Sequence, residues 1–161
     1  MKKFIFQFAL LVIGIFAVLF FYQKNPDLSG LPFVPERSVF KELQINSVKL
    51  KVEIADTQSK RSKGLGGREA LASDEGMLFI FPKTERHPFW MKGLSFPLDF
   101  IWIRGEVVVD LFQNIQPPTP DQPDESLPIY QSKEEVDQVL EVLGGTAAGL
   151  KLKIGDMVKV I

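Results

Sequence analysis

The stretch Leu-Asp-Phe-Ile-Trp-Ile-Arg-Gly-Glu-Val-Val-Val-Asp-Leu-Phe, residues 98–112, predicts the element around which the fold is built. Residues 98–103 and 107–112 are rich in β-branched and aromatic residues, as is typical of strands. Arg104, Gly105 and Glu106 separate the two runs, and a short glycine-containing turn between strand-like runs predicts a hairpin. We therefore expect a β-hairpin here, with further strands on both sides of it in the sequence.

Several other segments predict strands. Residues 47–54 alternate between apolar and polar positions, as a half-buried strand does. Residues 77–81 are apolar on both faces, so they should form a central buried strand that Pro82 ends. Residues 89–92 and 157–161 predict two short strands.

The helical signals are short. Thr57 is a candidate N-cap for a polar helix that ends at Gly64, and residues 68–72 should add one helical turn. Residues 132–143 begin with a capping-box pattern and have helical spacing, but residues 139–142 also fit a strand. Because strands outnumber helices, the sequence predicts an α+β, predominantly β domain: a small barrel or sandwich with short helices.

The N-terminus predicts a membrane anchor. Residues 4–21 are apolar with one polar member, and as a helix they would span about 27 Å, close to the ~30 Å hydrocarbon core of a bilayer. Two lysines precede this run, so the positive-inside rule places the N-terminus in the cytoplasm and the domain in the periplasm or at the cell exterior. A cleaved signal peptide is the alternative, although residues 19–22 are bulky and lack a small-residue cleavage pattern. We expect an uncleaved anchor over residues 1–23, in contact with the membrane through residues 4–22.

Two further segments stand out by their composition. Residues 24–46 are rich in proline, glycine and polar residues, which predicts a linker before a globular domain at 47–161. Residues 113–129 hold five prolines and should form an exposed loop, or an arm over a groove.

The net charge is −1, so no overall basic field recruits nucleic acid. Cysteine is absent, which excludes thiol catalysis, thiolate metal sites and disulfides.

A set of short motifs resembles a known family. The motifs are Gly64-Leu65, Arg68, Leu71, Gly76-Met77-Leu78-Phe79, Phe81-Pro82, Phe89-Trp90-Met91-Lys92, Pro97-Leu98-Asp99, Leu140-Glu141, Gly145 and Gly155-Asp156. In order and spacing they resemble the family of domains of unknown function numbered 192, over about residues 45–161. The resemblance implies a compact, mostly β fold, often behind an N-terminal signal or anchor, with a strand at 139–142. It implies no established activity.

A charged residue inside an apolar run marks the first candidate site. Asp99 lies between Leu98 and Phe100, and a buried carboxylate needs a cation or several backbone donors. Arg68 suits this role best, because its planar guanidinium can hold a carboxylate through two bonds. The set is either a structural ion pair or, together with Lys92, a site that binds an anionic group of a ligand.

A second candidate feature is an aromatic residue beside a cation. In an extended segment Trp90 and Lys92 share one face, opposite Phe89 and Met91. Such a surface commonly binds sugars or peptides, although Trp90 could instead cover a second core. The candidate ligand-binding residues are therefore Arg68, Trp90, Lys92 and Asp99.

The sequence predicts neither a metal site nor a cofactor. His87 is the only histidine, and a lone histidine without cysteine cannot build a zinc site. A copper(I) site from His87, Met77 and Met91 is the remaining metal alternative, but the methionines fit better as core residues.

Three functions stay open. The leading hypothesis is a membrane-anchored, extracytoplasmic module that binds a small ligand, a glycan or an envelope protein without catalysis. The second is an envelope glycan hydrolase in which Asp99 acts with Glu75 or Glu85, because glycoside hydrolysis uses two carboxyl groups. The third is a structural or assembly component with an exposed apolar patch. The basic run at 60–63 is either a solvated helix face or a contact for lipid head groups.

Overall fold

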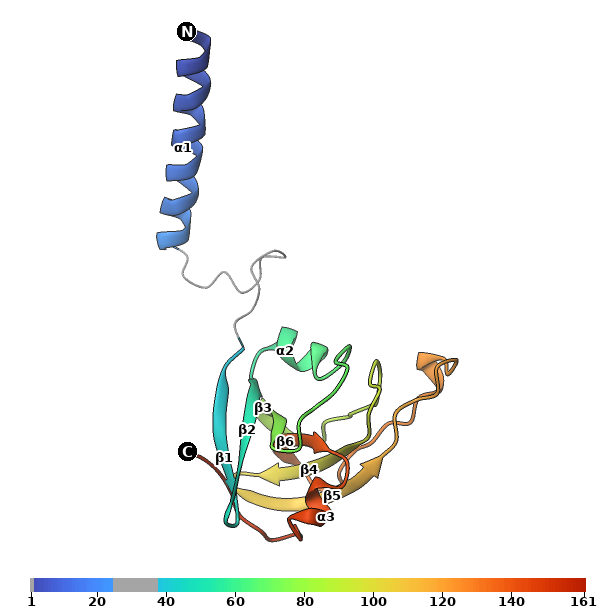
Figure 1. Ribbon diagram of the computed structural model, residues 1–161. Helices are drawn as coiled ribbons and strands as arrows, with labels where there is room; N and C mark the ends of the chain where they lie inside the picture. The colour runs from blue at the N-terminus through green and yellow to red at the C-terminus, as the bar shows by residue number, and fades with distance from the viewer. Residues whose placement is uncertain (1, 25–37) are drawn as a thin grey trace. The chain divides into compact units, whose positions relative to one another are not determined.

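The computed structural model describes residues 2–24 and 38–161, which belong to two compact units, residues 1–37 and 38–161 (Figure 1). The first unit contains helix α1 (Lys2–Lys24), so the predicted anchor segment is helical. Among the described residues, no helix combines the length and the apolar character that crossing a membrane requires. The predicted transmembrane span stays a prediction. Most of the predicted linker, residues 25–37, lies outside the described residues.

The second unit is built on a curled, seven-stranded sheet. Its strands are β1 (Phe40–Ile45), β2 (Val48–Ala55), β3 (Glu75–Glu85), β4 (Leu98–Arg104), β5 (Val107–Ile115), β6 (Val136–Leu143) and β7 (Val158–Val160). Their order is β5-β4-β6-β3-β2-β1-β7, with β2 and β3 parallel and the other neighbours antiparallel. The segment before β7 also reaches β5, because Val107 bridges Met157 and the Val108 amide donates to the Asp156 carbonyl at 2.9 Å. The sheet thus curls into a half-barrel, which agrees with the predicted α+β class.

The remaining helices are short: α2 (Gln58–Lys63), the 3-10 turn η1 (Asp124–Ser126) and α3 (Thr146–Gly149). The predicted start of α2 is confirmed, because the Thr57 hydroxyl accepts a hydrogen bond from the Lys60 amide at 3.2 Å. Its end is confirmed as well, since Gly64 adopts a φ of 53°. In Figure 1, α2 and α3 lie at opposite ends of the sheet. Residues 68–72 are not helical, so that prediction is wrong.

Most predicted strands are confirmed. Residues 98–103 and 107–112 form the β4–β5 hairpin, and residues 47–54 correspond to β2. Residues 139–142 belong to strand β6, as the family resemblance implied, and not to a helix.

Three boundaries need correction. Residues 40–45, predicted as linker, form β1, because they pair with both β2 and β7. Strand β3 continues past Pro82, where the β3–β6 register shifts between Ile80 and Glu85; an irregular strand accommodates a proline that cannot donate. Residues 89–92 form no strand, and only Phe89 is bridged, to Tyr130.

Both faces of the sheet are covered. Side chains alternate between the faces of a strand, so two buried rows run across β3, β6 and β4. One row is Phe79, Val139 and Trp102, and the other is Leu78, Leu140 and Ile101; each belongs to a separate hydrophobic cluster. The face with Phe79 and Trp102 is called the aromatic face below. The candidate site lies on this face.

Candidate ligand-binding site

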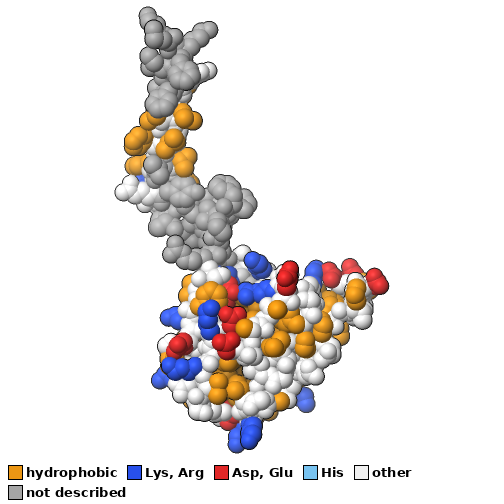
Figure 2. Space-filling view, viewed as in Figure 1, with side chains coloured by type: hydrophobic (Ala, Val, Ile, Leu, Met, Phe, Trp, Pro, Cys, Tyr) orange, Lys and Arg blue, Asp and Glu red, His pale blue; other side chains and the backbone are white. Residues whose placement is uncertain are grey.

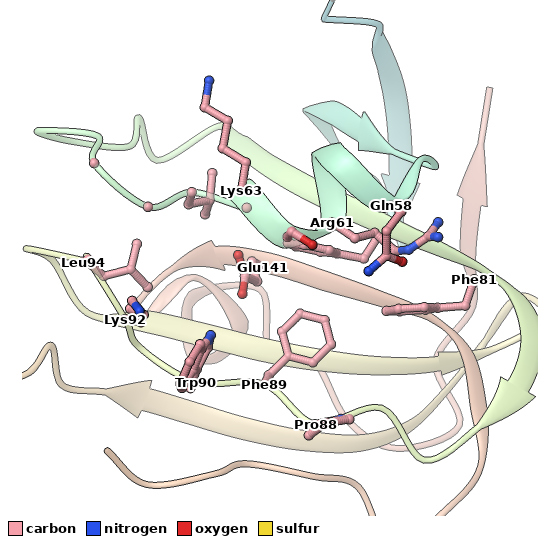
Figure 3. A pocket seen from close by; sticks show the side chains of 17 residues that line it. Gln58, Arg61, Lys63, Phe81, Pro88, Phe89, Trp90, Lys92, Leu94 and Glu141 are labelled. Atoms are coloured by element: carbon pink, nitrogen blue, oxygen red, sulfur yellow. The ribbon is translucent and has the colours of Figure 1, made fainter. Parts of the chain in front are cut away.

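A cavity of about 510 Å³ opens on the aromatic face. Its lining comes from α2, from the glycine-rich turn after it, from β3, from the segment Pro88–Leu94 and from β6 (Figure 3). Apolar walls are supplied by Leu65, Phe79, Phe81, Phe89, Trp90 and Leu94, and basic side chains by Arg61, Lys63 and Lys92. In the space-filling view, hydrophobic side chains gather on the visible face of the domain, beside basic and acidic ones (Figure 2). A volume of this size, with polar and apolar walls in nearly equal share, suits a small organic ligand.

Glu141 is the acid of this cavity. It lies on β6, is 4% exposed and lines the cavity, and Figure 3 shows its carboxyl group pointing into the space between α2 and the segment that carries Phe89 and Trp90. Within the described part of the chain it has no hydrogen bond and no ion pair. Burial raises the pKa of the Glu141 carboxyl to about 8, while the charge of Arg68 acts in the opposite direction. Among the described residues, the fully buried polar side-chain atom without a partner is Trp102 Nε1, so the Glu141 oxygens reach the open space of the cavity.

The sheet register explains the position of Glu141. Glu141 is paired with Met77 on β3, and Met77 with Glu53 on β2, so all three point to the aromatic face. Neighbouring strands lie about 4.8 Å apart, which places Glu53 and Glu141 roughly 10 Å apart on either side of Met77. Gly76 lets β3 approach β6 closely, because a Cβ on it would lie 2.7 Å from the Glu141 carbonyl oxygen.

Glu53 holds Arg68. The Arg68 guanidinium donates to the Glu53 carboxylate, and the Ser38 hydroxyl donates to the same carboxylate at 2.6 Å. Burial acts to raise the pKa of Glu53, but these two hydrogen bonds, with the charges of Arg68 and Lys63, outweigh it and hold the pKa below its usual value. Arg68 is therefore close enough to Glu141 to act on its pKa, but it is ion-paired with Glu53 and does not line the cavity.

Asp99 is buried, as its position in an apolar run predicted, but the predicted partner is wrong. Its carboxylate accepts backbone hydrogen bonds from Asn114 at 2.7 Å, Gly145 at 3.0 Å and Ala147 at 2.7 Å. The reason lies in the register, because Asp99 shares its face with Ile101, opposite to the aromatic face on which Arg68 binds. The sheet separates Asp99 from Arg68 and from the cavity. Asp99 fixes the turn before α3.

Trp90 and Lys92 both line the cavity, as the shared-face argument predicted. Trp90 is 45% exposed, whereas Phe89 and Met91 are buried in the core. The Lys92 ammonium lies 5.2 Å from the centre of the Trp90 ring and forms a 2.7 Å ion pair with Asp124 of η1. This ion pair holds the proline-rich segment 113–129 beside the cavity, but the residues of that segment are not part of the lining.

The arrangement that the hydrolase alternative requires is not present among the described residues. Among the described residues, Glu141 is the only acid in the lining of the cavity, and Asp99 lies on the other face. Glu75 is paired with Lys51 at 3.2 Å, and Glu85 lies 3.8 Å from Lys83. A glycosidase with two carboxyl groups at one bond does not fit this site.

The copper alternative also lacks support in the described residues. His87 stacks on Phe81, with ring centres 3.6 Å apart, and Met77 and Met91 are members of the buried core. No group of three His, Cys, Asp or Glu side chains that could hold a metal is found in residues 2–24 and 38–161.

The residue that sequence reasoning missed as a site residue is Glu141. The signal was present, because Glu141 lies between Leu140 and Val142 just as Asp99 lies between Leu98 and Phe100. Which of two such acids faces a cavity depends on strand register, and the sequence pattern does not specify the register.

Comparisons with known proteins agree with this fold. A protein from Novosphingobium aromaticivorans DSM 12444, of unknown function, is similar at 28% identity and a TM-score of 0.65, covering 80% of this chain and 89% of that chain. A proposed transcription regulator from Sinorhizobium meliloti 1021 is similar at 29% identity and a TM-score of 0.70, covering 79% of this chain and 98% of that chain. No curated protein matches the chain. The family model of DUF192, described as Uncharacterized ACR, COG1430, matches residues 41–160. The chain belongs to the DUF192 family.

Proposed function

We propose that the domain over residues 38–161 is a binding module for a small organic ligand, without catalysis of its own. The observation that carries this proposal is the cavity of about 510 Å³ with aromatic walls and an unpartnered, buried acid among its lining residues. A ligand that brings a hydrogen-bonding group to Glu141 would remove the cost of leaving that group unpaired. Trp90, Lys92 and Glu141 are the residues that we propose contact the ligand.

A thermal-shift screen of the full chain tests this function. The probes are short glycans, short peptides and small aromatic acids, amines and alcohols. A ligand that binds only the folded state stabilises it by about 2.7 kcal/mol at a hundredfold excess over its Kd, which raises the Tm by several degrees. If no probe of any class raises the Tm at millimolar concentration, the proposed function is wrong.

Two variants then locate the binding site. Trp90→Ala should weaken binding of an active probe by about tenfold or more, because exposed aromatic residues in a binding site contribute strongly to affinity. Ile154→Ala is the matched control, since Ile154 is also an exposed apolar residue, at 63%, but does not line the cavity. If the two substitutions changed the affinity for the probe equally, the probe would bind outside the cavity.

A membrane-anchored, extracytoplasmic location is also part of the proposal. It is supported by the apolar run at 4–21 behind two lysines. We expect the full chain to stay with membranes after alkaline extraction and a chain that starts at residue 38 to be released. Release of both would contradict the anchor and would leave the binding function untouched.

A further inference from the structure

The cavity has an unequal charge distribution. Three basic side chains line it, from Arg61, Lys63 and Lys92, against one acid. Arg61 donates to the carbonyl oxygens of Asp56 and Ile80, at 2.7 and 2.9 Å, and no acid of the described residues forms an ion pair with it. Lys63 has no ion pair within the described residues. Only the charge of Lys92 is balanced, by Asp124.

Glu141 adds little negative charge to this site at neutral pH. Its neighbours across the sheet are Met77 of β3 and Phe100 of β4, and Phe79 and Phe89 line the cavity with it. None of these side chains can neutralise a carboxylate. The charged group that acts on its pKa is Arg68, which Glu53 holds, while Arg61, Lys63 and Lys92 line the same cavity. Because the pKa of Glu141 is raised to about 8, its carboxyl group is mostly protonated near pH 7.

A protonated carboxyl group is a hydrogen-bond donor as well as an acceptor. Glu141 therefore presents an O–H group to the cavity near neutral pH, while Arg61 and Lys63 contribute positive charge that forms no ion pair with an acid of the described residues. A ligand amine would enter a positive field and would also have to draw the proton off Glu141. A ligand carboxylate meets a donor in a cavity whose charged lining residues are mostly basic. Its apolar part can pack against Phe79, Phe89 and Trp90.

We propose, building on the binding function above, that the cavity binds an organic anion, such as a carboxylate with an apolar body, whose oxygen accepts a hydrogen bond from the protonated Glu141 carboxyl group. The positive charge of the basic side chains in the lining attracts the anion, and the aromatic wall holds its body. Binding should then weaken as the pH rises and Glu141 loses the proton it donates.

Three probes of nearly equal shape test the ligand class by calorimetric titration of the full chain: 3-phenylpropanoate, 3-phenylpropylamine and 3-phenylpropanol. We expect the acid to bind most tightly near pH 7. We expect its affinity to fall about tenfold between about pH 6 and about pH 9, because the protonated fraction of a group with a pKa of about 8 falls by that factor. The probe itself stays an anion over this range.

Glu141→Gln is the decisive variant, because glutamine keeps a donor of similar shape at every pH. It should still bind the acid, and the pH dependence between about pH 6 and about pH 9 should disappear. Tighter binding of the amine than of the acid, or a pH dependence that persists in Glu141→Gln, would overturn the anion inference while leaving a binding function in place. Failure of all three probes to bind at millimolar concentration would overturn the inference, and the wider thermal-shift panel then decides the binding function separately.

Discussion

Replacing Asp99 by alanine is expected to destabilise the domain by about 3–5 kcal/mol, the range found when a buried charged or hydrogen-bonded partner is removed. The reason is the number of donors that lose their acceptor. The amides of Asn114, Gly145 and Ala147 all donate to this one carboxylate, which is fully buried. An unpaired buried donor costs about 1–3 kcal/mol, so the turn before α3 should lose its fixed geometry. Denaturant unfolding followed by circular dichroism measures the change.

Two further variants show whether the hydrogen bonds are the cause. Asp99→Asn keeps the shape and one acceptor oxygen but turns an amide donor toward a backbone N–H, so it should be destabilising but less so than alanine. Asp121→Ala removes an exposed acid of the proline-rich arm and should change stability by no more than about 0.5 kcal/mol. If Asp99→Ala were equally mild, the assignment of Asp99 as the structural anchor of this turn would be wrong.

The fold was largely predictable because local patterns dominate most of its elements. The 98–112 hairpin, strand β2 and the capped helix α2 are specified by hydrophobic alternation, a short turn and an N-cap threonine. Strand β1 was not predictable in the same way. Only two of its six side chains are buried, and its structure depends on pairing with β2 and β7, of which β7 is distant in the sequence.

The candidate site was predictable only in part. Trp90 and Lys92 follow from alternation within a single segment, and the structure places both at the cavity. The role of Asp99 depends on which strand face it shares. Alternation along a strand puts Asp99 on the face of Ile101 and not on that of Phe100, but no local pattern indicates which face carries the cavity. Glu53 takes a polar position in the alternating segment 47–54, where alternation predicts an exposed side chain, but Arg68 and Ser38 cover it and it is buried.

Glu141→Gln is expected to stabilise the protein above about pH 8 by an amount on the order of a few kcal/mol, and to leave stability nearly unchanged near pH 5. The pKa of Glu141 is about 8 in the folded state, against 4.5 for an unperturbed glutamate. The folded state therefore holds this proton more tightly than the unfolded state does. The stability of the wild type should fall as the pH rises from about 4.5 to about 8 and then level off. Glutamine carries no such proton, so the free energy of unfolding of Glu141→Gln should exceed that of the wild type by an amount that grows over the same pH interval.

The pH dependence of the difference isolates Glu141 from the other buried acid. Glu53 has a lowered pKa, so its contribution is lost as the pH falls through the folded pKa, in the wild type and in Glu141→Gln alike. Glu69→Gln is the control, because Glu69 is an exposed acid whose substitution should alter stability by no more than about 0.5 kcal/mol at any pH. Urea unfolding at several pH values between about 5 and 9 gives the three curves. If the difference in free energy of unfolding between wild type and Glu141→Gln stayed constant, Glu141 would be charged across this pH range. The proposed role of Glu141 as a hydrogen-bond donor would then be wrong.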